Sequence, residues 1–284
     1  MAEGLLDPRT IRQLAADLDL RPTKQRGQNF VHDANTVRRI VALSGITPDD
    51  VVLEIGPGLG SLTLGLLEVA RHVSVIEIES SLARRLPRTV EQRAPEAADR
   101  LSVIEADALT VEELPEPQPT AVVANLPYNV SVPVLLHVLA TFSTIRQGLV
   151  MVQSEVADRL VAGPGSKIYG VPSVKLAWYC SARRVGSVPP AVFWPVPNVD
   201  SGLVALQRRE QPATTASRQQ VFALVDAAFA QRRKMLRSAL AGVYGSSGRA
   251  SDALQTAGID PTARGEVLSV TDFARLAQVD PAPR

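Results

Sequence analysis

The four residues Asn125-Leu126-Pro127-Tyr128 carry groups that can hold an exocyclic amino group on a flat ring. The Asn125 side-chain oxygen and the Leu126 carbonyl can each accept a hydrogen bond from such an NH2 group. Pro127 fixes the backbone near its ring-locked angle, and Tyr128 offers a ring face on which a base can stack. A strand that ends in a proline turn, without any chemistry, is the alternative interpretation of these four residues.

A glycine-rich turn upstream, Glu54 to Gly60, follows an apolar run typical of a buried strand and precedes a run typical of a helix. Gly56, Gly58 and Gly60 allow the backbone to turn tightly and to approach a ligand closely. Their spacing, G-x-G-x-G, is shorter than the G-x-G-x-x-G that seats a pyrophosphate. Pro57 and the acidic Glu54 also disfavour a phosphate cradle, so the turn predicts another kind of ligand site.

Two acidic residues end the next two predicted strands, where ligands of open α/β sheets bind. Glu77 ends the second strand and can accept hydrogen bonds from both hydroxyls of a ribose. Asp107 ends the third strand and can accept a hydrogen bond from an adenine amino group. With the glycine-rich turn, these acids favour S-adenosylmethionine as the ligand, with Asn125 on the next strand end facing its methyl group. A surface charge or a helix cap is the alternative for each acid alone.

The first two thirds of the chain alternate between predicted strands and helices. Strands are predicted at 51–55, 72–78, 101–104, 121–124 and 148–152. Helices are predicted at 11–18, 36–43, 61–69, 81–93, 132–140 and 155–161. This order indicates an α/β fold, a mostly parallel sheet with helices on both faces.

The pattern changes after residue 180. Two further strands are predicted at 183–188 and 201–206, with a proline-rich loop between them. The polar segment 207–218 predicts a linker, and helical apolar spacing begins at residue 219. We therefore expect two domains. They are a catalytic domain at 1–208, which includes an N-terminal helix and a motif loop at 21–31, and a small all-helical domain at 219–284.

The composition argues against several classes of protein. The chain is 45% hydrophobic and 21% charged, which is ordinary for a globular protein. No apolar run approaches the roughly 18 residues of a membrane span, and the single cysteine, Cys180, excludes an internal disulfide. The histidines are scattered without metal-ligand spacing, so no metal site is expected. We expect a cytoplasmic protein.

Charge is unevenly distributed, although the net charge is only +1. Residues 45–120 hold 14 acidic and 6 basic residues, whereas residues 181–240 hold 9 basic and 3 acidic residues. A basic segment in a near-neutral protein can hold a polyanion on one face. The alternative is that these charges are simply solvated.

Together these residues closely resemble the motifs of the ribosomal RNA adenine N6-dimethyltransferases, in particular the type that acts on small-subunit (16S) rRNA. The resemblance runs from about residue 20 to the C-terminus, with the matches in the same order. The matching positions are 27–30, 54–60, Glu77, Asp107, 125–131, 192–201 and 231–237. The resemblance implies a Rossmann-like class I S-adenosylmethionine-dependent methyltransferase sheet with a small all-helical C-terminal domain.

The resemblance also implies a role for each matching residue. Cofactor contacts are implied for Gln28, Asn29, Val31, Glu54, Gly56, Gly58, Gly60, Glu77, Ile78, Asp107, Ala108 and Asn125. Catalytic roles are implied for Asn125, Leu126, Pro127, Tyr128 and Phe193. The rings of Tyr128 and Phe193 would hold a flipped base between them. Contacts with rRNA, from one helix, are implied for Arg232, Arg233, Lys234 and Arg237.

The implied activity is the transfer of methyl groups to N6 of two adjacent adenosines in the 3′-terminal hairpin of 16S rRNA. The implied partner is the small ribosomal subunit during its biogenesis, and we expect a monomer. Three alternatives remain: a large-subunit (23S) rRNA methyltransferase of the macrolide-resistance type, a ribosome-assembly factor whose binding matters more than its catalysis, and a DNA adenine methylase. The long loop from Phe193 to Ser201 and the segment 231–237 favour the small-subunit type.

Overall fold

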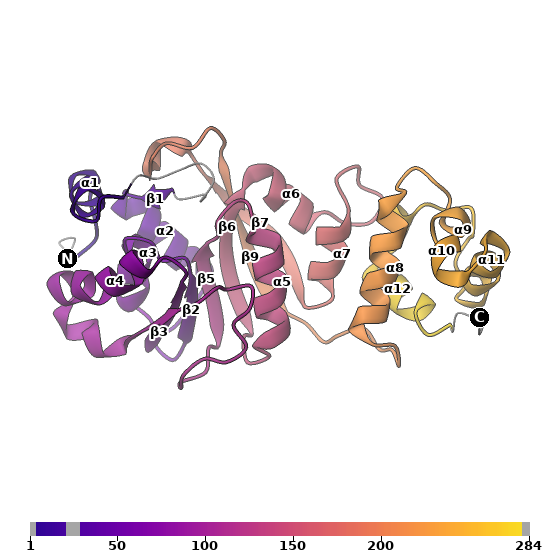
Figure 1. Ribbon diagram of the computed structural model, residues 1–284, viewed down its shortest axis with the longest axis horizontal. Helices are drawn as coiled ribbons and strands as arrows, with labels where there is room; N and C mark the ends of the chain where they lie inside the picture. Colours follow the sequence, from indigo (N-terminus) through magenta and orange to yellow (C-terminus); the bar gives the residue numbers. More distant parts are fainter. Residues whose placement is uncertain (1–3, 21–28, 280–284) are drawn as a thin grey trace. The chain divides into compact units, whose positions relative to one another are not determined.

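A seven-stranded mixed sheet, in the order β4-β3-β2-β5-β6-β9-β7, is the largest element of the fold (Figure 1). The structure, a computed structural model, describes residues 4–20 and 29–279. The strands are β2 (Val51–Ile55), β3 (His72–Glu77), β4 (Leu101–Glu105), β5 (Ala121–Asn125), β6 (Gln147–Gln153), β7 (Cys180–Val188) and β9 (Ser201–Arg208). Strands β2 to β6 pair in parallel, and β9 is antiparallel to β6. The predicted α/β sheet is confirmed.

The order of the strands reverses between β2 and β5. From β2 the chain moves outward through β3 to β4, then returns to β5 on the other side of β2 and continues to β6. The carboxyl ends of β2 and β5 therefore flank a switch point, where open α/β sheets bind ligands. Because the glycine-rich turn follows β2 and Asn125 ends β5, the fold brings both motifs to one edge of the sheet.

The two strands at the switch point are buried along almost their whole length. All five residues of β2 and the first four of β5 are buried. A parallel strand covered on both faces needs a continuous apolar run rather than an alternating one. The runs at 51–55 and 121–124 are of this kind, which explains why the sequence predicts both strands closely.

The helices that pack around these strands are α1 (Pro8–Asp17), α2 (Ala34–Ser44), α3 (Ser61–Leu67), α4 (Ser80–Arg93), α5 (Ser131–Thr141) and α6 (Ser154–Val161). In Figure 1, α2, α3 and α4 lie on one side of the strands and α5 on the other. Aspartates cap two of the helices, with Asp7 accepting from the Thr10 amide at 2.7 Å and Asp33 from the Thr36 amide at 2.6 Å. These helices match the predicted ones to within a few residues.

A second, two-stranded sheet forms where the sequence predicts only loops. β1 (Phe30–Val31) pairs antiparallel with β8 (Phe193–Trp194), in the register Phe30↔Trp194 and Val31↔Phe193. Strands of two residues are too short to show an alternating pattern, so the sequence holds no signal for them. The motif loop predicted at 21–31 thus ends in a strand, and residues 21–28 lie outside the described residues.

The chain divides into two compact units. The first comprises Met1–Ala157 and Arg183–Arg208, and the second comprises Asp158–Ala182 and Arg209–Arg284. The division after residue 208 coincides with the expected linker, since β9 ends at Arg208 and the next helix begins at Arg218. Residues 158–182, which we expected in the catalytic domain, group with the second unit. Within the described residues, no helix has the length and apolar character needed to span a membrane.

The second unit is helical. Its helices are α7 (Val171–Ala177), α8 (Arg218–Ala230), α9 (Leu236–Ala239), α10 (Ala241–Tyr244), α11 (Ser247–Thr256) and α12 (Val270–Leu276). Ser217 caps α8 in a reciprocal pair with Gln220. The expected helix over 231–237 is wrong, because α8 ends at Ala230 and residues 231–234 form a turn. The Leu236 amide donates to the Ala263 carbonyl at 2.8 Å, so the backbone after the turn is held by the segment before η4 (Gly265–Val267).

Candidate active site

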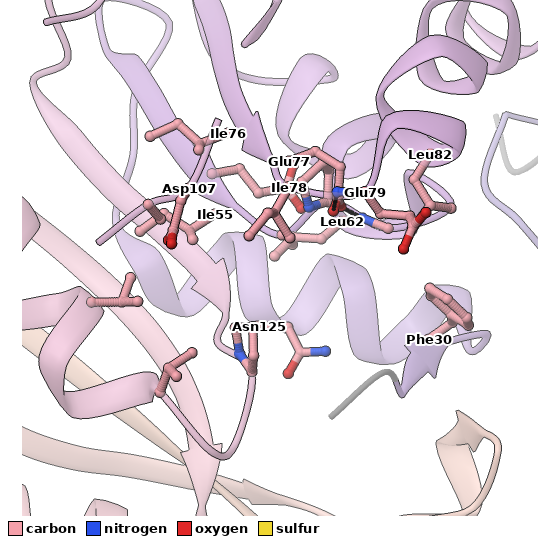
Figure 2. Close-up of a pocket in the computed structure, with 18 of the residues that line it drawn as sticks. Phe30, Ile55, Leu62, Ile76, Glu77, Ile78, Glu79, Leu82, Asp107 and Asn125 are labelled. Carbon is pink, nitrogen blue, oxygen red and sulfur yellow. Dashed lines mark hydrogen bonds between the residues drawn. The ribbon is translucent and has the colours of Figure 1, made fainter. Parts of the chain in front are cut away.

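A cavity of about 460 Å³ lies at the switch point, a size typical of small-molecule sites (Figure 2). It is walled by β1, the glycine-rich turn, the segments after β3 and β4, and the residues after β5. The lining residues are Asn29, Phe30, Val31, Glu54, Ile55, Gly56, Pro57, Gly58, Ser61, Leu62, Ile76, Glu77, Ile78, Glu79, Leu82, Ala106, Asp107, Ala108, Leu109, Asn125, Pro127, Asn129, Val130 and Val134. Strand ends that are far apart in the sequence thus meet around one space.

The glycine-rich turn has a backbone conformation that glycine adopts without strain. Gly56 and Gly58 have φ angles of 66° and 58°, in the left-handed region. A Cβ atom on Gly58 would lie 2.6 Å from Phe30 Cε1, so a side chain there would displace the Phe30 ring. The Gly56 amide donates to the Ile76 carbonyl at 2.9 Å, which ties the turn to β3. A ligand can therefore approach the backbone of this turn closely.

Glu77 is held by two backbone amides at the end of β3. Its Oε2 accepts a hydrogen bond from Gly58 N at 3.1 Å, and its Oε1 accepts one from Glu79 N at 2.9 Å. The side chain is buried, and this burial raises its pKa. A carboxylate has about four acceptor positions, so these two bonds fix the group without using all of them. It can accept from a pair of hydroxyls.

Glu54 is deeply buried at the bottom of the cavity wall, with 2% of the residue exposed. Its Oε2 accepts a hydrogen bond from Thr63 Oγ1 at 2.6 Å. Burial raises the pKa of Glu54 to about 8, and the nearby Glu77 carboxylate adds to the rise. At neutral pH Glu54 therefore keeps its proton and can donate a hydrogen bond as well as accept one.

Asp107 and Ile78 offer a polar and an apolar contact in the same cavity. Asp107 Oδ1 accepts a hydrogen bond from Leu109 N at 2.9 Å, which orients the carboxylate. Ile78 is 68% exposed although it is a large apolar residue, and it lines the cavity beside Glu77. Together these residues can pack against a flat ring and bond to its edge.

A backbone carbonyl that lies outside β5 orients the Asn125 side chain. Its Nδ2 donates to the Asn29 carbonyl at 3.1 Å. A carbonyl only accepts, so Nδ2 must be the atom that faces Asn29, and Oδ1 is the atom turned away. The Leu126 amide donates to the Met151 carbonyl at 3.0 Å, which fixes the start of the tetrapeptide on β6. The side chains of Asn125, Glu77 and Asp107 all stand around the cavity in Figure 2.

Comparison with known families decides the identity of this site. The sequence model of the family described as "Ribosomal RNA adenine dimethylase" matches residues 20–279. The chain belongs to the ribosomal RNA adenine dimethylase family. It is therefore an S-adenosylmethionine-dependent methyltransferase, as the motifs at the switch point predict.

Individual relatives and solved structures agree with this assignment. The chain is 63% identical to "Ribosomal RNA small subunit methyltransferase A" of Streptomyces coelicolor over 277 residues, which are 97% of each chain. It is 63% identical to the protein of the same name from Cutibacterium acnes over 280 residues, 97% of this chain and 94% of the relative.

Two solved structures share the fold. A dimethyladenosine transferase from Plasmodium falciparum has a TM-score of 0.73 at 24% identity, covering 87% of this chain and 95% of the other. The 23S rRNA methyltransferase ErmE has a TM-score of 0.64 at 29% identity, covering 87% of this chain and 98% of the other.

The residues present fit the cofactor of the family. Ser61 Oγ is buried in the cavity lining and has no hydrogen-bond partner within the described part of the chain. An unsatisfied hydroxyl of this kind is what a polar ligand group would satisfy. The Glu77 carboxylate can accept hydrogen bonds from ribose hydroxyls, and the apolar Ile78 side chain can pack against a flat ring. The turn at Gly56 and Gly58 leaves room for a ligand along its backbone.

Most of the predicted cofactor residues meet in the cavity. Those that line it are Asn29, Val31, Glu54, Gly56, Gly58, Glu77, Ile78, Asp107, Ala108 and Asn125. Gly60 does not line it but caps α3 with a φ angle of 95°, and Gln28 lies outside the described residues. Other cavity-lining residues, which lie outside the predicted set of cofactor contacts, include Ser61, Leu62, Glu79, Leu82, Leu109 and Val134. Ser61 and Glu79 adjoin predicted motifs, whereas Leu82 and Val134 are apolar helix residues with no distinguishing signal.

The two rings expected to hold a target base differ in their exposure to solvent. Tyr128 is partly buried after β5, and its hydroxyl lies 2.7 Å from Ser201 Oγ. Burial raises the pKa of this hydroxyl, so it remains protonated. Phe193 is only 1% exposed and packs in the core beneath β8. The expectation that Phe193 presents an open face is therefore not met in this conformation, because pairing with β1 turns the ring inward.

The basic residues 232–237 also divide into two kinds. Arg232 Nε lies 3.0 Å from Glu266 Oε2, and Arg232 Nη2 donates to the Lys167 carbonyl at 2.6 Å. Arg233, Lys234 and Arg237 are exposed. The four basic residues therefore do not share one helix face: Arg232, Arg233 and Lys234 lie in the turn after α8, and Arg237 lies in α9. Arg232 is bound within the second unit.

Proposed function

We propose that this chain transfers methyl groups from S-adenosylmethionine to N6 of two adjacent adenosines in the 3′-terminal hairpin of small-subunit (16S) rRNA, giving N6,N6-dimethyladenosine during small-subunit biogenesis. The observation that carries the proposal is the placement of Asn125. Its side chain is oriented by a hydrogen bond to the Asn29 carbonyl, and it lines the same cavity as Glu77 and Asp107. The relatives named small-subunit methyltransferases are 63% identical to it over nearly their full length.

The chain supplies positioning for the reaction rather than a strong base. The bound cofactor supplies a methyl group on a positively charged sulfur. Asn125 Oδ1 and the Leu126 carbonyl would each accept a hydrogen bond from one N–H of the adenine amino group, which favours a tetrahedral nitrogen with its lone pair directed at the methyl group. As the nitrogen bonds to the methyl carbon, the carbon–sulfur bond would break and its electron pair would stay on the sulfur. The nitrogen would release its proton to solvent in this step or after it. These oriented acceptors stabilise the charge that develops on the nitrogen.

The second methyl transfer needs no change in the site. N6-methyladenine keeps one amino hydrogen and the same ring face, so one acceptor and the Tyr128 stack still hold it. Stacking of a flipped base on an aromatic ring contributes about 1–3 kcal/mol. Tyr128 is the ring nearest in sequence to Asn125, and its hydrogen bond to Ser201 fixes the ring's position.

The principal competing function is methylation of large-subunit rRNA. A 23S rRNA methyltransferase shares the fold at 29% identity, less than half the identity to the small-subunit relatives. We propose Arg233, Lys234 and Arg237 as phosphate contacts to the small-subunit rRNA, since all three are exposed within one short stretch of the chain, the first two in the turn after α8 and the third in α9. Arg232 is left out of this set because its guanidinium is bound within the second unit.

A labelling experiment tests the proposal. Undermethylated small subunits and, in parallel, large subunits are incubated with the protein and methyl-labelled S-adenosylmethionine, and the modified bases are mapped. We expect label on two adjacent adenosines of 16S rRNA and none on 23S rRNA. Label confined to 23S rRNA, or label on duplex DNA but not on 16S rRNA when duplex DNA is offered in a third parallel reaction, would overturn the proposal. The Asn125→Ala variant is the control, because it should bind small subunits without labelling them.

A further inference from the structure

The small β1–β8 sheet lines the cofactor cavity with β1. Its other strand, β8, begins the loop from Phe193 to Ser201, here called the Phe193 loop. On the β1 side, Asn29, Phe30 and Val31 all line the cavity. The Phe30 ring lies so close to the glycine-rich turn that a Cβ on Gly58 would be 2.6 Å from it. The carbonyl of Asn29 holds the Asn125 amide at 3.1 Å. Any ligand against this turn therefore shares a wall with β1.

On the β8 side, the same sheet holds Phe193 inside the core. Phe193 faces Val31 in the register, and the His32 amide donates to the Val192 carbonyl at 3.0 Å. The loop that begins here ends at Ser201, whose hydroxyl contacts Tyr128. The proposed target-base residues are thus tied at one end of the loop to β1 and at the other end to the catalytic tetrapeptide.

One aromatic pair joins the two strands. The rings of Phe30 and Trp194 are stacked with centroids 6.3 Å apart and an interplanar angle of 21°. Trp194 does not line the cavity, whereas Phe30 does. An effect of Trp194 on the cofactor must therefore pass through Phe30 or its strand.

We propose that Trp194 is a positioning residue that couples occupation of the cofactor cavity to the packing of the Phe193 loop through its stack on Phe30. The part of the proposal that concerns Phe193 rests on the proposed function. The coupling itself is a property of cofactor binding. A cofactor that presses on the Phe30 ring changes the stack, and the change is transmitted to β8. By reciprocity, removing the Trp194 ring alters cofactor affinity.

Fluorescence tests the link without any turnover. The chain has two tryptophans, so the Trp178→Phe variant leaves Trp194 as the single emitter. We expect its emission to change saturably as S-adenosylmethionine or S-adenosylhomocysteine is added, and the change to disappear when Phe30→Leu is introduced. Unchanged emission while calorimetry shows saturated binding would overturn the proposal.

A double-mutant cycle on cofactor affinity supplies a second test. We expect Trp194→Leu to weaken cofactor binding about 3- to 10-fold, the range for one aromatic pair, and Trp194→Phe to restore most of it. In the Phe30→Leu background the Trp194→Leu loss should vanish, since the partner ring is already gone. Equal losses in both backgrounds would overturn the coupling. Since no RNA is present, failure here is distinguishable from failure of the proposed function, which the base mapping decides.

Discussion

The cofactor cavity and the basic segment at 231–237 handle charge in opposite ways. In the cavity, the residues Glu54 and Glu77 are only 2% and 5% exposed, and their carboxyl groups accept hydrogen bonds from Thr63 and Gly58. In the basic segment, Arg233, Lys234 and Arg237 are exposed to solvent. Buried groups respond to pH through desolvation and respond weakly to salt, whereas exposed cations respond to salt. The first region suits the fixed orientation of one small molecule, and the second suits the loose polyanion binding that we propose for it.

The largest expected effect concerns Asn125, the side chain that we propose faces the reacting atoms. Asn125→Ala removes one acceptor for the adenine amino group, and we expect the turnover rate to fall by about 10²–10³-fold, as for loss of one preorganised polar group. Cofactor affinity, measured by calorimetry, should change little. Methyl incorporation near that of the unmodified chain would show that the cavity does not act through Asn125.

The next effect concerns cofactor binding rather than the methyl-transfer step. Glu77→Ala removes charged acceptors for two hydroxyls, and we expect cofactor affinity to fall about 10- to 100-fold. Calorimetry with S-adenosylhomocysteine measures this directly. Glu91→Gln, an exposed acid on α4, is the matched control and should leave affinity unchanged. An equal effect of both substitutions would point to general charge rather than to the ribose contact.

The pH response of stability tests the burial of Glu54. Because its folded pKa is raised from 4.5 to about 8, the folded state binds the additional proton between these values. The contribution of Glu54 to stability is therefore fully present below pH 4.5 and is lost as pH rises towards 8. We expect Glu54→Gln to flatten the fall in Tm over this range. Parallel Tm curves for the two proteins would mean that Glu54 ionises freely in the cavity.

The basic segment at 231–237 should respond to salt instead. Replacing Arg233, Lys234 and Arg237 together with Gln should reduce the salt slope of rRNA binding by about 2, because each phosphate that the protein neutralises adds roughly 0.7 to the slope. Filter binding at several salt concentrations measures the slope, and cofactor affinity should be unchanged. A slope that stays the same would place the phosphate-binding residues elsewhere on the chain.

The smallest effect is expected within the turn itself. Arg232→Gln breaks the bonds to Glu266 and the Lys167 carbonyl, so we expect Tm to fall by about 2–4 °C. The salt slope of rRNA binding should be nearly unchanged, in contrast to the triple variant. A reduced slope without a change in Tm would return Arg232 to the set of phosphate-binding residues.

The cavity could be predicted from the sequence because its geometry is largely local. Gly56 and Gly58 allow the turn, and apolar runs predict the strands β3 and β4. Glu77 is the last residue of β3, and Asp107 follows the end of β4. Parallel strands then bring these ends to one edge. The contributions of Leu82 and Val134 depend on how helices pack, which periodicity alone does not specify.

The regions predicted wrongly depend on distant partners. The apolar spacing of α8 continues through Met235 and Leu236, yet the helix ends at Ala230 and the backbone bonds to residue 263 instead. Burial of Phe193 likewise results from pairing with β1, about 160 residues away in sequence. Tertiary hydrogen bonds and packing overrode local propensity in both places.

The reversal of strand order at β2 and β5 also has a use in protein engineering. The cavity lies at the carboxyl ends of the parallel strands, so the segment between Asp107 and β5 crosses back to the opposite edge of the sheet. Glu112 and Glu113 on this segment are exposed. A short peptide tag or a dye-bearing cysteine placed between them would sit on an outer surface of the first unit. The molecule could then be captured or tracked on ribosomal particles with its catalytic edge left unobstructed.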